Sequence, residues 1–218
     1  METNDIDFID FLRQRLKEQL PGQTAHLEMA PLIKEKPFRT LQASPDAIVC
    51  AVLVLLFQNK IDKKINVLLT LRSKNINHSG QISFPGGRSE NSETAIETAL
   101  RETEEEIGIH PNLIQILGTL SQLYVPPSNS LITPIVGFIS DDIIFNTNSD
   151  EVDEVFSVPL DTLLNDDFLK RETWKLDYYE IDVPFWDIHH STPLWGATAM
   201  MLKELLTLYQ EFQNKLQN

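Results

Sequence analysis

The strongest constraint in this sequence is an acidic, amphipathic segment between Gly87 and Ile109. On an α-helix, Glu102, Glu105 and Glu106 stand at positions i, i+3 and i+4, so their carboxylates project from one face. Like charges at this spacing repel each other, and a hard divalent cation with oxygen ligands is the simplest compensation. The opposite face carries an apolar stripe that consists of Ala95, Ile96, Ala99, Leu100 and Ile107. The segment therefore predicts a helix that packs on a core with one side and binds metal with the other.

Glycines delimit this helix. Gly86 and Gly87 precede it and allow a backbone turn that residues with a Cβ resist. Gly108 follows it and suits a helix end. Ser92, ahead of a run of helix-forming residues, predicts the region of the N-cap.

The spacing of the charged residues and glycines in this segment resembles the Nudix hydrolase box. The matching positions are, in chain order, Gly87, Glu93, Arg101, Glu102, Glu105, Glu106, Gly108 and Ile109. Thr103 stands where the box usually has an apolar residue. The resemblance implies a metal-dependent hydrolase of a phosphoanhydride bond. It also implies an α/β fold of the Nudix type, an α/β/α sandwich with a mixed β-sheet.

The same resemblance assigns metal ligands. Glu102, Glu105 and Glu106 would hold the metal, with the Gly86 carbonyl contributing. Oxygen-only ligation favours Mg²⁺ or Mn²⁺ over zinc, and Mg²⁺ commonly bridges protein carboxylates and substrate phosphates.

The remaining catalytic positions are less well defined. Glu93 and Arg101, at i and i+8, are expected on nearly the same side of the helix, where they would orient the loop and the carboxylates. The general base is either a helix carboxylate or a Glu from a later segment. Glu151 and Glu154 are the candidates there, and we favour Glu154.

A second signature lies upstream of the box. Residues 68–73, followed by residues 80–87, resemble the additional motif of the coenzyme A pyrophosphatase branch of Nudix hydrolases. Further patches in the same order resemble this branch at residues 124–128, 131–137, 154–160 and 194–199. The implied reaction splits coenzyme A, or an acyl or oxidised derivative, into 3′,5′-ADP and 4′-phosphopantetheine or its derivative.

Arg72, Lys74, Gly86 and Gly87 are the expected substrate-binding residues. The branch typically has a second Arg after the position of Arg72, but residues 74–79 contain none. Arg72, Lys74 and His78 are the cations that could replace it. Two alternatives stay open. A Nudix enzyme for ADP-ribose or another nucleoside diphosphate derivative would keep the box without the upstream signature. A non-catalytic Nudix binding module would usually have lost a carboxylate or Arg101.

Charge and hydropathy limit the partners. The 18 basic and 32 acidic residues give a net charge of −14, which argues against a broad nucleic-acid surface and disfavours an RNA-end hydrolase. The first residues lack a basic start and a long apolar stretch, and no run elsewhere has the length to span a membrane. We therefore expect a cytoplasmic enzyme with a small nucleotide substrate and neither nucleic acid nor membrane as partner. The family resemblance allows a homodimer.

The periodicity along the 218 residues predicts a single domain over residues 1–218. We expect an N-terminal helix over residues 5–20, an irregular stretch over 22–44 and a hairpin of strands 47–57 and 65–71. Strands at 114–125, 131–139 and 151–160 should follow, then a short helix at 160–164, a β-rich segment at 173–183 and a closing helix at 194–216. Strands interleaved with a few helices imply one mixed sheet covered by helices on both faces.

One further motif is a pair of histidines near the C-terminal helix. His189 and His190 are adjacent, which suggests a transition-metal site. Side chains of adjacent residues diverge in most backbones, however, and no Cys or third His is near in the sequence. The sequence therefore does not favour a metal site at this pair.

Overall fold

The computed structural model describes residues 5–33, 42–74, 80–90, 92–140, 145–176 and 179–217. The α-helices are α1 (Asp5–Arg15), α2 (Gln23–Glu28), α3 (Ala95–Ile107), α4 (Leu160–Leu163) and α5 (Gly196–Gln217). The first strands are β1 (Leu32–Ile33), β2 (Ile48–Gln58), β3 (Ile65–Arg72), β4 (Ile82–Ser83), β5 (Gly86–Arg88) and β6 (Gln115–Thr119). The later strands are β7 (Leu123–Val125), β8 (Ser130–Ile139), β9 (Val152–Pro159), β10 (Leu169–Leu176), β11 (Tyr179–Trp186) and β12 (Leu194–Trp195). Short 3-10 helices cover Pro111–Leu113 and Pro126–Ser128.

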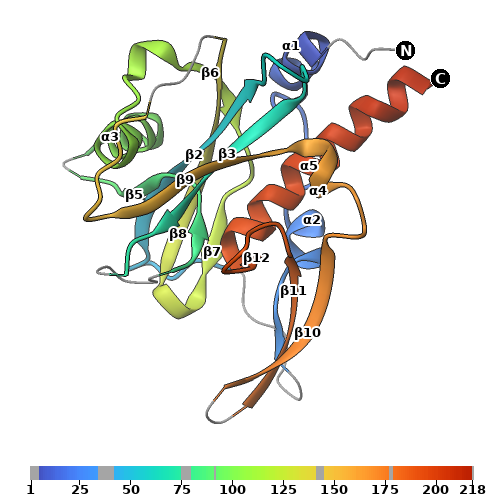
Figure 1. Cartoon of the computed structure of the whole chain (residues 1–218). Coiled ribbons are helices and arrows are strands. Elements are labelled where there is room, and N and C mark those ends of the chain that lie inside the picture. Colours follow the sequence, from blue (N-terminus) through green and yellow to red (C-terminus); the bar gives the residue numbers. More distant parts are fainter. Residues whose placement is uncertain are drawn as a thin grey trace.

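A large mixed sheet forms the centre of the molecule. Its strand order is β4-β3-β2-β8-β6, with β5 paired to β2, β7 to β8 and β9 to β3. The pairing of β2 with β8 is parallel, with Leu53 opposite Ile135, and the other pairings are antiparallel. Figure 1 shows α3 on one side of this sheet and α1 and α5 on the other. The expected α/β/α arrangement with a mixed sheet is confirmed.

Strand β2 reads as a nearly continuous apolar run because both of its faces are buried. Leu53 and Leu55 point into a cluster with Ala99 and Ile107 of α3. Val54 and Leu56 point to the other face, into the larger cluster that contains residues of α1 and α5. This alternation follows from the period of two along a strand and seats α3 directly on the sheet.

A second, four-stranded sheet was not predicted. Its order is β1-β11-β10, with β12 paired to β11. Strands β10 and β11 form a long antiparallel hairpin that projects below the body of the molecule in Figure 1. Strand β1 belongs to the stretch over residues 22–44 that we expected to be irregular, and it pairs with β11, with Leu32 opposite Asp182. A two-residue strand gives no periodic signal of its own, so only its partner strand identifies it.

Other elements match the expectations with limited shifts. The strands expected at residues 47–57, 65–71, 131–139 and 151–160 correspond to β2, β3, β8 and β9, and the expected hairpin of β2 and β3 is confirmed. The helices expected at 160–164 and 194–216 correspond to α4 and α5, whereas α1 ends at Arg15, before residue 20. The single strand expected at residues 114–125 is wrong, since β6 and β7 are separate there. The chain leaves the ladder around Ser121, whose N–H and hydroxyl groups donate to Glu204 of α5.

That carboxylate ties the N-terminal segment to the C-terminal helix. Glu204 is fully buried and accepts hydrogen bonds from Gly22 N–H (2.7 Å), from Ser121 N–H (3.0 Å) and from the Ser121 hydroxyl (2.7 Å), and it contacts His26 Nε2 at 3.1 Å. Burial raises the pKa of Glu204, but the hydrogen bonds from His26, Ser121 and Gly22 outweigh it and leave this pKa lowered. A buried carboxylate with four donors is stable in its charged form, so α2 and α5 are held together through it.

No helix in the described part of the chain is both long enough and apolar enough to cross a bilayer.

Candidate active site

Helix α3 begins later than the sequence suggested. Its N-cap is Thr94, in a capping box with Glu97, and Ser92 lies outside the helix. Glu93 therefore precedes the helix, and the expectation that it lies on the same helix side as Arg101 is wrong. The helix ends as expected at Gly108, which is left-handed (φ 73°).

The buried side of α3 differs in part from the predicted apolar stripe. Ala99 and Ile107 are buried as expected, but Ile96 is 39% exposed. Thr103 is fully buried instead, and its hydroxyl donates to the Ala99 carbonyl at 2.6 Å. A hydroxyl that bonds within its own helix can occupy an apolar position, which explains this departure from the usual box.

Arg101 is the central cation of the site. Its Nε and Nη2 donate to the two carboxylate oxygens of Glu93 at 2.7 and 3.1 Å, a bidentate pair. Its Nη1 donates both to Glu102 and to Glu105, each at 3.0 Å. The hydrogen bond from Arg101, together with one from the Glu90 N–H, lowers the pKa of Glu93 to about 2. Glu93 thus fixes Arg101 from outside the helix, and Arg101 holds two of the three clustered carboxylates.

Glu102 lies against the turn that precedes the helix. A Cβ at Gly87 would stand 2.5 Å from the Glu102 carboxyl carbon, so only glycine leaves room for this carboxylate. Burial raises the pKa of Glu102, against the lowering effect of Arg101, and the negative charge of Glu151 adds to the rise. The carboxylate is therefore confined between a backbone turn and a guanidinium.

Glu106 is the most buried acid of the cluster, with 3% of its surface exposed. It accepts a hydrogen bond from the Gly86 N–H (3.2 Å), and Arg72 Nη1 lies 3.9 Å from its other oxygen. Burial raises the pKa of Glu106 to about 7, although Arg72 and the Gly86 N–H oppose the rise. Arg72 and the Gly86 N–H therefore do not keep the Glu106 carboxylate fully ionised at neutral pH.

By donor type, these carboxylates fit a hard dication. The Glu105 side chain is 55% exposed, whereas those of Glu102 and Glu106 are largely buried. An ion among them would therefore have one carboxylate on its solvent side and two on its interior side. The three are held apart, because Arg101 attracts Glu102 and Glu105 while Gly86 and Arg72 attract Glu106. Another group of possible metal ligands lies away from α3. Among the described residues, Glu154, His189 and His190 each offer one ligand atom within 4.8 Å of those of the other two.

The structure separates the two candidates for a later acid. The charge of Glu151 raises the pKa of both Glu102 and Glu106, so Glu151 lies near the cluster of α3. Glu154 lies on β9 with its carboxylate 3.2 Å from His189 Nε2. Its neighbour Val155 packs on the α3 side of the sheet, and Phe156, two residues on, packs on the opposite side. Glu154 shares the face of Phe156 and is not brought to the cluster. Glu151 precedes β9, and the pairing of β9 with β3 has a bulge between Val152 and Glu154, so the alternation along the strand does not determine the direction of Glu151.

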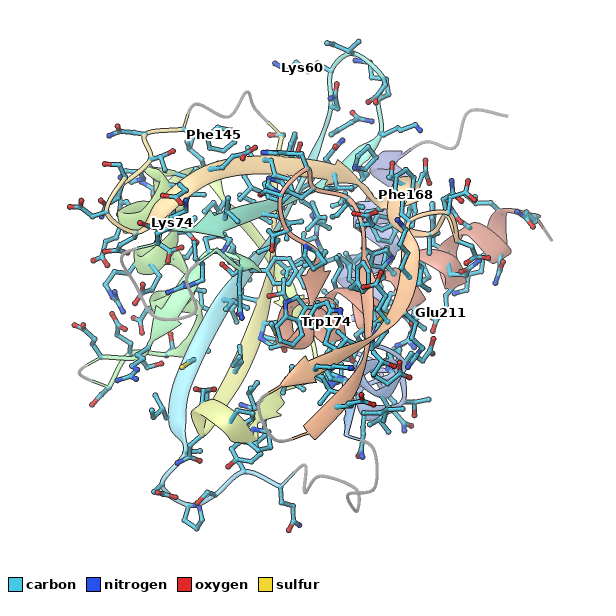
Figure 2. The ribbon with its side chains drawn as sticks, turned by 60° about the horizontal axis from the view of Figure 1, so that its bottom comes forward. Lys60, Lys74, Phe145, Phe168, Trp174 and Glu211 are labelled. Carbon is cyan, nitrogen blue, oxygen red and sulfur yellow. The ribbon has the colours of Figure 1, made fainter. Side chains whose placement is uncertain are left out.

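The expected substrate-binding cations lie at the end of β3. Arg72 is its last residue, and its N–H donates to the Gln81 carbonyl. Lys74 follows in an exposed turn, on the same side of the molecule as α3 (Figure 2). His78 lies outside the described residues.

Residues 48–179, which contain α3 and the large sheet, match the NUDIX domain family. This chain belongs to the Nudix family. Nudix hydrolase 3 of Caenorhabditis elegans is 37% identical over 174 residues, which cover 72% of each chain. The uncharacterized Nudix hydrolase NudL of Yersinia enterocolitica is 37% identical over 149 residues, which cover 64% of this chain and 71% of NudL. Among solved structures, the Nudix hydrolase RenU of M. smegmatis has the same fold, with a TM-score of 0.55 at 15% identity over 80% of this chain and 96% of RenU.

Family and relatives identify the protein as a Nudix pyrophosphohydrolase. Nudix hydrolases generally require divalent metal ions, in agreement with the acidic cluster on α3. The carboxylates of this Nudix hydrolase are positioned by Arg101, by Gly87 and by the turn at Gly86.

Proposed function

We propose that this Nudix hydrolase cleaves the pyrophosphate of coenzyme A, or of an acyl or oxidised derivative. The products are 3′,5′-ADP and 4′-phosphopantetheine or its derivative. The observation that supports this substrate is the position of Arg72, whose guanidinium lies 3.9 Å from Glu106. A phosphorylated ligand over the acidic cluster would lie close to this cation.

Coenzyme A differs from most nucleoside diphosphate derivatives in its 3′-phosphate. A guanidinium is a natural bidentate partner for phosphate, and Lys offers a point charge. Arg72 ends β3 beside Glu106 of the acidic cluster, and Lys74 follows two residues later in the chain. In our proposal they bind the additional phosphate and take the place of the second Arg that the coenzyme A branch typically has.

Glu102, Glu105 and Glu106, with the Gly86 carbonyl, would hold Mg²⁺ or Mn²⁺ in this proposal. Such an ion neutralises charge on a pyrophosphate and lowers the pKa of a bound water. Arg101 orients Glu102 and Glu105, and Glu93 holds Arg101 in place. In this proposal Glu151, and not Glu154, is the general base. The charge of Glu151 affects the pKa of Glu106, whereas the Glu154 carboxylate lies 3.2 Å from His189 Nε2.

The test compares coenzyme A with 3′-dephospho-coenzyme A, which differ only in the 3′-phosphate. The wild-type enzyme with Mg²⁺ should prefer coenzyme A by about 10- to 100-fold in kcat/KM, since a charge-assisted hydrogen bond contributes about 1.5 to 3 kcal/mol. Arg72→Ala or Lys74→Ala should remove this preference. Arg171→Ala on the distant strand β10 is the matched control and should keep it.

The outcomes separate the alternatives. Equal rates with coenzyme A and its 3′-dephospho form would reject recognition of the 3′-phosphate by Arg72 and Lys74. Faster cleavage of ADP-ribose or NADH would reject coenzyme A and leave a Nudix pyrophosphatase for another nucleoside diphosphate derivative. Release of no phosphorylated product from any of them would favour a binding module. For the base, Glu151→Gln should lower kcat by at least about 100-fold, in the range of general-base catalysis, and Glu154→Gln should not. The single domain, the homodimer and the cytoplasmic location stay predictions.

A further inference from the structure

A second cluster of metal-binding side chains lies away from α3. Glu154 comes from β9 of the large sheet, and His189 and His190 come from the bend between β11 and β12 of the small sheet. One ligand atom of each of the three lies within 4.8 Å of the others. The sequence led us to expect that the two side chains diverge, and they do not. The backbone bends there, and their rings lie tilted against each other with centroids 4.3 Å apart.

His189 is held in place on every side. Its side chain is 4% exposed, and its ring lies 4.9 Å from that of Phe156. Its Nε2 lies 3.2 Å from a Glu154 carboxylate oxygen. Its Nδ1 lies 3.1 Å from the Ser191 hydroxyl. Packing therefore fixes the ring with Nε2 pointing toward the Glu154 carboxylate, where both side chains could bind the same ion.

We propose that Glu154, His189 and His190 bind a transition-metal dication of the Zn²⁺ type. Two imidazoles and one carboxylate form a donor set that suits zinc and its neighbours better than Mg²⁺. In a tetrahedral site with bonds of about 2.0 to 2.1 Å, two ligand atoms stand about 3.3 Å apart. The 3.2 Å between His189 Nε2 and Glu154 already has this length. The His190 side chain is exposed, so a rotamer change can bring its ring nitrogen from within 4.8 Å to the distance that a tetrahedral site requires.

The surroundings agree with this assignment. The Ser191 N–H donates to His189 Nδ1 at 3.3 Å, so the ring proton is on Nε2 and points to Glu154. An ion on Nε2 would move this proton to Nδ1, where the Ser191 hydroxyl is in position to accept it, as a metal-binding His usually requires. The two histidines also line a groove of about 400 Å³, together with Lys170, Glu172, Trp174 and Asp187. Trp174 lies on the side of the hairpin that faces the body of the molecule (Figure 2). A fourth ligand, such as water, has access from this groove.

The site is independent of the acidic cluster. Glu154 shares the sheet face of Phe156, opposite the face on which α3 packs. Nothing in the donor set depends on which phosphoanhydride the enzyme cleaves. A bound ion would instead join β9 of the large sheet to the segment between β11 and β12, and thereby link the two sheets.

Cobalt provides a direct test because Co²⁺ substitutes for Zn²⁺ and shows visible absorption bands that report its coordination. We would titrate the full-length purified protein with Co²⁺ in the presence of excess Mg²⁺, then displace the Co²⁺ with Zn²⁺. The background is Glu105→Gln, which weakens ligation at the α3 cluster. We expect one equivalent of Co²⁺ to bind with four-coordinate bands, and Zn²⁺ to raise the melting temperature.

Variants locate the ion. Glu154→Gln and His190→Asn alter partly exposed or exposed side chains, so both should fold, and each should raise the Kd for Co²⁺ by more than about tenfold, since even the loss of an outer-shell partner costs 10- to 100-fold. His189→Asn should have the same effect. His110→Asn, at an exposed histidine elsewhere, is the matched control and should leave binding unchanged. The proposal is overturned if the Glu105→Gln protein gives no Co²⁺ bands, or if the bands persist when Glu154→Gln or His190→Asn is added to it.

Discussion

Glu106 allows the most quantitative test of the site, because its ionisation opposes folding. Burial raises the pKa of this carboxyl from 4.5 to about 7. Below pH 4.5 the group is protonated in both states. As the pH rises, it ionises first in the unfolded chain, so the free energy of unfolding of the metal-free protein falls until the pH passes about 7. Each pKa unit corresponds to about 1.4 kcal/mol, so the loss at pH 8 is about 3 kcal/mol.

Glu106→Gln should remove this loss. The amide oxygen of Gln can still accept from the Gly86 N–H, and no charge remains to be buried. In the presence of a chelator, the variant should be more stable than wild type by about 1 to 3 kcal/mol at pH 8, the lower figure allowing for the lost partner of Arg72. At pH 5 the difference should be under about 1 kcal/mol. Urea denaturation at both pH values measures these free energies.

The control is Glu104→Gln, which changes an exposed acid on the same helix and should alter stability by no more than about 0.5 kcal/mol. Equal stability of wild type and Glu106→Gln at pH 8 would refute the reasoning that burial dominates at this carboxyl. The same variant should lose most of its hydrolytic activity at saturating Mg²⁺, as should Glu105→Gln. A site that gains stability when a functional charge is removed is a common sign of selection for activity.

Further predictions concern the turn, the ion pair and the buried carboxylate. Gly86→Ala should destabilise the fold by about 2 to 4 kcal/mol in urea denaturation, because φ is 149° and a Cβ would overlap a backbone carbonyl. At Gly87 an added Cβ would meet the Glu102 carboxylate and no backbone atom, so Gly87→Ala should cost less stability than Gly86→Ala and lose about 100-fold in kcat in a steady-state assay. Because the pKa of Glu93 is lowered, this carboxylate stabilises the fold above pH 4.5, and the stabilisation is lost as the pH falls toward about 2. The melting temperature of Glu93→Gln should therefore depend less on pH over this range than that of the wild type. Glu204→Gln should cost about 3 kcal/mol by the same denaturation assay, because an amide group would face four donors.

The sequence predicted those parts of the fold whose signals are local. Strand β2 and helix α5 show long apolar patterns, and both were expected within a few residues. The small sheet was not expected, because β1 has two residues and its pairing with β11 depends on segments far apart in the chain. The break between β6 and β7 was missed for a similar reason, since a hydrogen bond from Ser121 to the distant Glu204 produces it.

In the site, spacing predicted which residue types gather but not how they are held. The i, i+3, i+4 pattern identifies Glu102, Glu105 and Glu106, yet it contains no information on burial, and burial is what separates Glu106 from Glu105. The choice between Glu151 and Glu154 could not be made from the sequence, because Glu151 lies just before β9 and the strand begins with a bulge between Val152 and Glu154.

The pairing of β1 with β11 has a consequence for the order of events during synthesis. All strands of the large sheet lie between residues 48 and 159, so this sheet can close while the end of the chain is still being translated. The small sheet and the contact of α2 with α5 require residues beyond 179, so the N-terminal segment must wait without its partners until these emerge. Contacts between segments far apart in the chain are slow to form, so docking of the N-terminal segment with the C-terminal segment is the expected late step of folding on the ribosome. Before this step, β1 and the residues that later bind Glu204 are accessible to a chaperone or a protease.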